Sequence, residues 1–179
     1  MRFVILGLLL SGPLSLYDVR KRFTAGISLF YSASFGSIQR ALKQLVDVGA
    51  VTVHAVTDSA RGKRLYQVTD DGRRSWRDWM LEPIPPGQEA ETTILAKVFL
   101  LGRLDLAADR VAVLEAAKAC AGRELASLQA LASELDSIAA TVPEQHRATF
   151  GYQRATLDYG VRAQRLRHAW LDHLLQVSS

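Results

Sequence analysis

The stretch that decides the fold is residues 34–68, which read SFGSIQRALKQLVDVGAVTVHAVTDSARGKRLYQV. Ser34 is a favourable helix N-cap, and apolar residues recur after it at helical spacing until Gly49, where the helix should end. The period then changes to that of strands over 51–55 and 64–68, with a polar turn between them. We therefore expect a helix followed by a β-hairpin. The inward residues of the helix are predicted to be Phe35, Ile38, Leu42 and Leu45.

Two helices are expected before this stretch and one after it. An apolar run over 3–10 predicts a first helix that Gly12-Pro13 stops, and Ser15 and Asp18 have the spacing of a capping box for a second. Thr69 is placed to cap a further helix that ends near Leu81. Three helices, a hairpin and another helix, in that order, predict a winged helix-turn-helix.

The outer face of the third helix and the hairpin carry side chains suited to DNA. Polar side chains on the helix can hydrogen-bond to base edges, and cations on the helix and the hairpin can neutralise phosphates. Any one of these charges is equally well explained as solvated surface, so their joint placement is what favours DNA. The predicted DNA-binding residues are Ser34, Ser37, Gln39, Arg40, Lys43, Gln44, Arg61, Lys63 and Arg64.

The distribution of charge supports the same interpretation. The 179 residues carry 22 Lys and Arg against 18 Asp and Glu, a net charge of +4. Residues 1–80 hold 12 of the basic and 6 of the acidic side chains, so the net positive charge lies there and residues 81–179 are net negative. A basic surface confined to one part of a chain favours a polyanionic partner for that part.

A proline-rich segment over 83–90 separates this region from a helical second half. We expect it to link a DNA-binding domain over 1–82 to a helical dimerisation domain over 91–179. Helices are predicted over 92–101 and 106–140, and a last long helix begins near Glu144. The predicted fold class is mainly α, with an α+β winged domain followed by an all-α domain.

The two long helices have apolar positions spaced for packing against other helices. On the first of them Leu residues recur at multiples of seven, and one side of the last helix carries aromatic and apolar residues from Tyr152 to Val177. This pattern predicts a homodimer. The predicted dimerisation residues are Leu114, Leu128, Leu135, Tyr159, Leu166, Trp170 and Leu174.

Other classes of protein find little support in the sequence. The single cysteine, Cys120, cannot form an internal disulfide, which fits a reducing cytosol, and its apolar neighbours favour packing over redox sensing. No catalytic motif or metal-ligand cluster is present, so we expect no enzyme activity, no metal and no cofactor. The run 3–10 is too short for a membrane span and is better explained as a buried helix than as a signal peptide. We expect a cytoplasmic, nucleoid-associated protein.

The order and spacing of these motifs resemble the PadR family of bacterial transcriptional regulators. The resemblance rests on ILGLL at 5–9, GPLSLYDV at 12–19, SFGSIQRALKQL at 34–45 and GKRLYQVTDDG at 62–72. LAKVF at 95–99 and the two long helices are similar to the dimerisation domain of the longer, virulence-activator-like members. The resemblance implies a homodimer that binds a two-fold related operator in double-stranded DNA, usually as a repressor, with some members released by small molecules. Many members have Tyr-Pro where this chain has Gln39-Arg40, so the operator sequence does not carry over.

Two questions stay open from the sequence. Trp76, Trp79 and Phe99 are candidates to line an effector pocket for a small hydrophobic or aromatic molecule, although aromatic residues at helical spacing more often belong to a core or an interface. The alternative function is a winged-helix module that binds protein and not DNA. The basic third helix and hairpin argue against it, because a protein-binding helix more often exposes aromatic residues or leucine.

Overall fold

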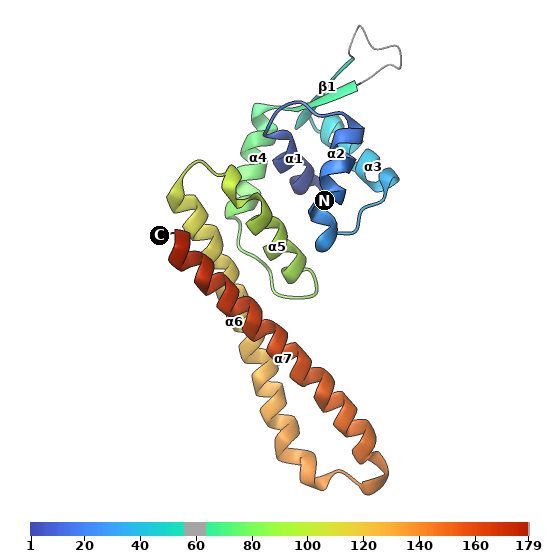
Figure 1. Cartoon of the computed structure of the whole chain (residues 1–179), viewed down its shortest axis with the longest axis vertical. Helices are drawn as coiled ribbons and strands as arrows, with labels where there is room; N and C mark the ends of the chain where they lie inside the picture. The colour runs from blue at the N-terminus through green and yellow to red at the C-terminus, as the bar shows by residue number, and fades with distance from the viewer. Residues whose placement is uncertain (56–63, 179) are drawn as a thin grey trace. The chain divides into compact units, whose positions relative to one another are not determined.

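A computed structural model describes residues 1–55 and 64–178 of the protein (Figure 1). Most of these residues are helical, and they include one two-stranded sheet, which confirms the mainly α fold class. The chain divides into two compact units. The first unit comprises Met1–Pro83 and Glu91–Val113, and the second comprises Ile84–Ala90 and Leu114–Ser179.

The first three helices are α1 (Arg2–Leu9), α2 (Leu16–Thr24) and α3 (Phe35–Asp47), with a short 3₁₀ helix, η1 (Ile27–Leu29), between α2 and α3. The predicted capping box of α2 is present. The amide of Asp18 donates to the Ser15 hydroxyl over 3.2 Å, and the amide of Ser15 donates to the Asp18 carboxylate over 3.1 Å. Because these contacts satisfy amides that have no partner within the helix, the residues fix where α2 begins.

The hairpin consists of β1 (Val51–Ala55) and β2 (Arg64–Val68), with the predicted bounds, paired antiparallel so that Val51 lies opposite Val68. Leu14, in the connection between α1 and α2, adds a bridge to Tyr66 with N–O distances of 2.8 and 3.0 Å. This bridge ties the hairpin to the helical part of the first unit.

Two glycines allow α3, the hairpin and α4 (Asp70–Leu81) to pack closely together, one at a turn and one at a close contact. Gly49 has a φ of 72°, a left-handed conformation that favours glycine, and it directs the chain from α3 into β1. A Cβ atom at Gly72 would lie 2.1 Å from the carbonyl oxygen of Ala50, so α4 can approach β1 only with glycine there. Thr69 caps α4 as predicted, its hydroxyl accepting from the Gly72 amide over 3.1 Å.

The core of the first unit extends beyond the predicted DNA-binding domain. Residues 91–113, which the sequence places in the dimerisation domain, pack with the first unit. They include most of α5 (Ala90–Leu100) and all of η2 (Leu101–Arg103), and they supply Ala96, Leu100, Leu104 and Val113 to the same buried cluster as α1. The physical reason is that α5 has buried residues on several of its sides. Such a helix is stable only where apolar residues of other elements surround it.

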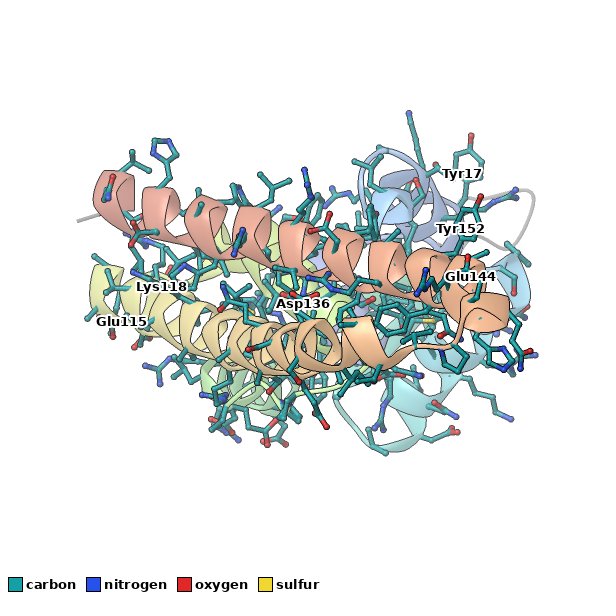
Figure 2. All side chains as sticks on the ribbon, turned by 90° about the horizontal axis from the view of Figure 1, so that it is seen from below. Tyr17, Glu115, Lys118, Asp136, Glu144 and Tyr152 are labelled. Atoms are coloured by element: carbon teal, nitrogen blue, oxygen red, sulfur yellow. The ribbon has the colours of Figure 1, made fainter. Side chains whose placement is uncertain are left out.

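The second unit is an antiparallel pair of helices. α6 (Ala107–Ile138) continues from the first unit, and α7 (Glu144–Ser178) follows the short η3 (Ala139–Thr141). Among the described residues, three ion pairs join the two helices, and residues with higher numbers on α6 pair with residues with lower numbers on α7. Figure 2 shows Lys118 and Asp136 on the side of α6 that faces α7. The three pairs are Asp136–Arg154, Glu124–Arg167 and Lys118–Asp172.

The most deeply buried side chains of the helix pair lie toward the end where α6 begins and α7 ends, and Val161 near the middle of α7 is also buried. Leu114, Cys120 and Ala121 on α6 are fully buried, as is Leu171 on α7. Between residues 122 and 160, all of which the structure describes, no side chain is buried. The distal half of the pair therefore has no apolar core within a single chain.

Phe35 and Leu114 differ in exposure from what the sequence predicts. Phe35 was expected to point inward, but it is 47% exposed and lies under the Arg20 guanidinium, 5.8 Å from the ring centre, because the first turn of α3 projects beyond the core. Leu114, predicted as a dimerisation residue, is fully buried within the single chain, so it does not lie on a free surface. No helix in the described ranges is long and apolar enough to cross a membrane.

Candidate nucleic-acid interface

The two faces of α3 differ sharply in polarity. Ile38, Leu42 and Leu45 are buried in the core of the first unit, as the helical spacing predicts. On the opposite face Gln39 and Arg40 are exposed, as are Lys43 and Gln44 one turn later. This spacing places the four polar side chains on one solvent-facing side of α3, since residues three or four apart in a helix are neighbours.

A groove of about 390 Å³ joins this face of α3 to the hairpin. Gln39, Arg40 and Lys43 of α3 line one side of it, and Arg64 and Tyr66 of β2 line the other. We call it the α3–hairpin groove. Residues that are more than 20 positions apart in the chain therefore contribute cations and an amide to one concave surface.

The cations of the α3–hairpin groove are Arg40, Lys43 and Arg64. Among the described residues no ion pair or hydrogen bond engages the side chains of Arg40, Lys43 or Arg64. Elsewhere in the same unit cations are paired, as with Arg74 to Asp71. Cations without local partners keep their full capacity to bind phosphate or base edges, because no intramolecular contact has to be broken first.

Two of the predicted DNA-binding residues also hold the start of α3. The Ser34 hydroxyl accepts from the Ser37 amide over 3.2 Å, and the Ser37 hydroxyl donates to the Ser34 carbonyl over 2.7 Å. Their first role is capping, which orients the N-terminal turn of α3. The predicted contacts Arg61 and Lys63 lie outside the described residues.

The sequence did not indicate which basic residues of α2 are available to a partner. Arg22 is engaged, because its guanidinium donates to the Ser11 hydroxyl over 2.6 Å and to the Leu8 carbonyl over 3.3 Å. Arg20 is exposed and covers Phe35 at the start of α3. The contribution of Val53 and Tyr66 to the groove was also missed, because it depends on how the hairpin packs beside α3.

The predicted effector aromatics have separate environments. Trp76 is buried against α1, where a Cβ atom at Gly7 would lie 2.8 Å from the indole nitrogen. Trp79 stacks on Phe3 with ring centres 5.1 Å apart, and Phe99 packs at a tilt against Phe30. Of the three predicted residues, only Trp76 lines the 540 Å³ cavity beside α4.

A buried lysine lies next to these aromatic residues. The ammonium of Lys97 on α5 donates to the Glu82 carbonyl over 2.5 Å and lies 5.4 Å from the centre of the Trp79 ring. Burial lowers the pKa of Lys97 from 10.5 to about 8, and the nearby Glu82 carboxylate opposes that change. No sequence pattern indicates that this residue, which is 2% exposed, is buried.

Cys120 is a packing residue. It is fully buried on α6, and burial, with a further contribution from Glu124, raises the pKa of its thiol above the ordinary value. The thiolate is the reactive form of cysteine, so both effects make the side chain unreactive.

Comparison with known proteins matches two family descriptions to these two parts of the chain. The transcriptional regulator PadR-like family matches residues 5–78, and the virulence activator alpha C-terminal family matches residues 92–178. Residues 5–78 therefore form a domain of the PadR-like family of transcriptional regulators, and residues 92–178 form a virulence activator alpha C-terminal domain. A PadR-like family of regulators is not a family of enzymes, in agreement with the expectation from the sequence.

Two curated relatives share this PadR-like sequence. The negative transcriptional regulator PadR of Bacillus subtilis is 30% identical over 105 residues, which are 58% of this chain and 58% of the relative. A probable transcriptional regulator of Mycobacterium tuberculosis is 30% identical over 71 residues, 39% of this chain and 38% of the relative. The chain thus spans between about two fifths and three fifths of the curated relatives it matches.

Solved structures of PadR-like proteins also align over nearly the whole chain. Bacillus subtilis PadR in complex with operator DNA has a TM-score of 0.45 at 24% identity, covering 99% of this chain and 98% of that one. The same protein in complex with p-coumaric acid has a TM-score of 0.42 at 24% identity, with coverage of 99% and 94%. The Vibrio cholerae virulence activator AphA has a TM-score of 0.42 at 22% identity, with coverage of 98% and 95%.

Proposed function

We propose that the protein is a sequence-specific DNA-binding transcriptional regulator, acting as a repressor on a two-fold related operator. The observation that carries the proposal is the α3–hairpin groove, where cations from α3 and β2 that have no partner among the described residues converge beside exposed amide side chains. Such a mixture of point charges and bidentate donors and acceptors fits the phosphates and base edges of a major groove. The match of residues 5–78 to the PadR-like family supports the same function.

The groove suggests a division of labour among its side chains. Arg40 and Gln39 lie in the first half of α3, the part of a recognition helix that reaches base edges. An arginine pairs best with guanine and a glutamine with adenine. Lys43 and Arg64 are placed to contact the phosphates on either side, so they would set affinity and not sequence preference.

Dimerisation is proposed through the exposed side of α7. Tyr152, Tyr159 and Leu166 recur every seven residues, and each is more than 70% exposed in the single chain. At about 100° per residue these positions lie about 140–180° around the helix from Val161, which is buried. Figure 2 shows Tyr152 projecting from α7 away from α6.

A second copy of the chain is the occupant that best fits this surface. Two helices alone cannot enclose an apolar core, and the distal half of the pair, with no buried side chain between 122 and 160, needs another surface to pack against. A self-complementary contact in a two-fold dimer supplies it and places two α3 helices on one operator. Trp170 and Leu174 are half-buried beside the exposed positions and extend the proposed interface, as do Leu128 and Leu135 on α6.

Response to a small hydrophobic or aromatic effector is part of the proposal. Bacillus subtilis PadR has been crystallised both with operator DNA and with p-coumaric acid, and the present chain shares 30% identity with that regulator over 105 residues. The described residues offer no comparable support for a module that binds protein and not DNA, because the exposed side of α3 is polar.

The deciding experiment is binding of the full chain to a labelled duplex from the region upstream of its own gene. We expect saturable binding whose affinity falls steeply between 50 and 200 mM salt, with a slope set by the number of phosphate contacts. A shuffled duplex of the same composition is the control and should bind more weakly by at least about a thousandfold. Absence of salt-dependent binding to the upstream duplex would refute the proposed function.

A further inference from the structure

We propose that Phe35 is a positioning residue for DNA binding: its ring holds the guanidinium of Arg20 beside the first turn of α3, where Arg20 binds a DNA phosphate. This role rests on the proposed DNA-binding function and adds a contact from α2 to those of the α3–hairpin groove. Neither Arg20 nor Phe35 lines that groove. The role accounts for a large aromatic side chain that is 47% exposed at the start of α3.

The contact joins two helices that lie side by side in the first unit (Figure 1). Arg20 is on α2 and Phe35 is the first residue of α3, and the Cζ atom of Arg20 lies 5.8 Å from the centre of the Phe35 ring. A guanidinium within about 6 Å of a ring centre is attracted by the electron-rich face of the ring. The ring therefore restricts the positions of the long, exposed side chain of Arg20.

The same contact leaves the hydrogen-bond donors of Arg20 unused. In the described ranges, no hydrogen bond or ion pair engages its guanidinium. A guanidinium has several N–H donors, and attraction to a ring face pairs none of them with an oxygen. Arg22 differs, because its guanidinium donates to the Ser11 hydroxyl and the Leu8 carbonyl. Arg20 is thus held in place and still able to form the paired hydrogen bonds that phosphate accepts.

A second guanidinium reaches the same turn of α3. A Cβ atom at Gly36 would lie 3.9 Å from the Nη1 atom of Arg40, so the side chain of Arg40 runs back along α3 toward its first turn. Two cations near one turn repel each other in the free chain, and an anion beside them relieves that repulsion. DNA supplies such an anion, because phosphates flank the groove into which a recognition helix fits.

The two helices contain few carboxylates that could neutralise Arg20. Residues 15–48 include two acidic side chains, Asp18 and Asp47. The Asp18 carboxylate accepts from the amide and the hydroxyl of Ser15 in the capping box at the start of α2. Asp47 is the last residue of α3, about three turns from Phe35. The positive charge of Arg20 therefore stays available to a partner.

A positioned Arg20 strengthens binding to DNA of any sequence. Ordering a long arginine side chain on binding costs conformational entropy, and part of that cost is removed when the ring already restricts the guanidinium in the free chain. A contact to phosphate carries no information on the base sequence. Loss of Arg20 or of the ring should therefore weaken binding to the upstream duplex and to the shuffled duplex by the same factor.

Titration of both labelled duplexes with the full chain, followed by fluorescence anisotropy at several salt concentrations, tests the proposal. Arg20→Ala should weaken binding to both duplexes about fivefold and lower the slope of the salt dependence by about one, because one phosphate contact is lost. Phe35→Leu keeps the charge of Arg20 and an apolar side chain but removes the ring face. It should weaken binding to both duplexes about threefold.

A double-mutant cycle separates positioning from a direct role of Phe35. Because Phe35 acts through Arg20, Phe35→Leu should cause no further loss of affinity in a chain that already carries Arg20→Ala. The matched control is Lys21→Ala, which removes the next exposed cation of α2, about 100° around the helix from Arg20. In that background Phe35→Leu should still weaken binding about threefold. Phe35→Tyr keeps a ring and should recover most of the affinity that Phe35→Leu loses. Thermal melts confirm that each variant is folded.

Two results would overturn this role of Phe35 while the unaltered chain binds the upstream duplex. Arg20→Ala binds both duplexes as tightly as the unaltered chain, which would mean that Arg20 contacts no phosphate. Phe35→Leu weakens binding equally with and without Arg20→Ala, which would mean that Phe35 contacts DNA itself or only shapes α3. Failure of the unaltered chain to bind either duplex would refute the proposed function as well, so the two failures are distinguishable.

Discussion

The two units of the chain use apolar side chains in opposite ways. In the first unit a cluster of buried residues from α1 to α5 forms a complete core, and the exposed side of α3 is polar. In the second unit the contact between α6 and α7 beyond Ala121 includes the ion pairs of Asp136 and Glu124 with α7, and Tyr152, Tyr159 and Leu166 of α7 are at the surface. A unit with a closed core can present polar groups for recognition, whereas a pair of helices with an open apolar side is built for association.

This comparison predicts which substitutions disturb which property. Changes on α7 should affect association and leave the packing of the first unit intact. Changes in the core of the first unit should affect folding. Changes on the exposed side of α3 should affect neither association nor folding and should alter only DNA binding.

Leu166→Asp should separate the proposed dimer. The substitution adds a carboxylate to each copy at the centre of the exposed side of α7, and burying an uncompensated charge costs several kcal/mol. We expect the dimer to weaken by about 4 kcal/mol, roughly a thousandfold, in light scattering or sedimentation.

Arg165→Asp is the matched control for association. Arg165 is also exposed on α7 but lies about 100° around the helix from Leu166, so its substitution should leave the dimer intact. A dimer unaffected by Leu166→Asp would show that the exposed side of α7 does not pair, and the comparison between the units would fail at this point.

Gly72→Ala should destabilise the first unit by about 3 kcal/mol. The new Cβ atom would lie 2.1 Å from the Ala50 carbonyl oxygen, a backbone atom that also accepts from the Thr69 amide and cannot move freely. Gly102→Ala is the control, because a Cβ atom there has no neighbour within 4 Å. Urea unfolding followed by tryptophan fluorescence measures both. Equal midpoints for the two variants would contradict the close approach of α4 to β1.

Local sequence signals predicted much of the first unit. The caps Ser15, Ser34 and Thr69 each act on an amide within three residues, so sequence alone contains the whole interaction. The bounds of both strands followed from the change of period after Gly49. The polar side of α3 followed from the spacing of its apolar residues in the same way, since periodicity fixes which residues share a face.

Features that depend on distant neighbours were not predictable. The exposure of Phe35, the contacts of Arg22 with the end of α1 and the packing of residues 91–113 in the first unit all depend on tertiary contacts. Lys97 illustrates the limit best. A lysine in a helix is ordinarily a surface residue, and only the nearby Trp79 ring and Glu82 carbonyl show why this one is buried.

Lys97→Met should stabilise the protein at pH 7. Burial lowers the pKa of Lys97 from 10.5 to about 8, a difference that corresponds to about 3 kcal/mol of cost for the charged form in the folded state. Loss of the hydrogen bond to the Glu82 carbonyl offsets about 1 kcal/mol. We expect a net gain of about 2 kcal/mol in the free energy of unfolding.

The gain from Lys97→Met should vanish at high pH. Below pH 8 both the folded and the unfolded chain carry the proton, so the folded state bears the full cost of the charge. Between about pH 8 and 10.5 the folded lysine loses its proton while the unfolded one keeps it, so the unaltered chain gains stability as pH rises. Urea unfolding at pH 7 and pH 10 measures the change, with the exposed Lys21→Met as control. A pH-independent difference would contradict the assignment to burial of a charge.

Arg40→Ala and Arg64→Ala should have small and distinguishable effects on DNA binding. Arg40 faces outward from the first half of α3, so its loss should cost about 1–3 kcal/mol on the upstream duplex and much less on a shuffled one. Arg64 is on β2, where a phosphate contact is expected. Its loss should therefore weaken binding to both duplexes by about 1 kcal/mol and lower the slope of the salt dependence by about one. Arg74→Ala, which removes a paired cation outside the groove, should change the affinity for neither duplex. If Arg40→Ala weakened both duplexes equally, α3 would contribute only charge, and the polar side of the first unit would not read sequence.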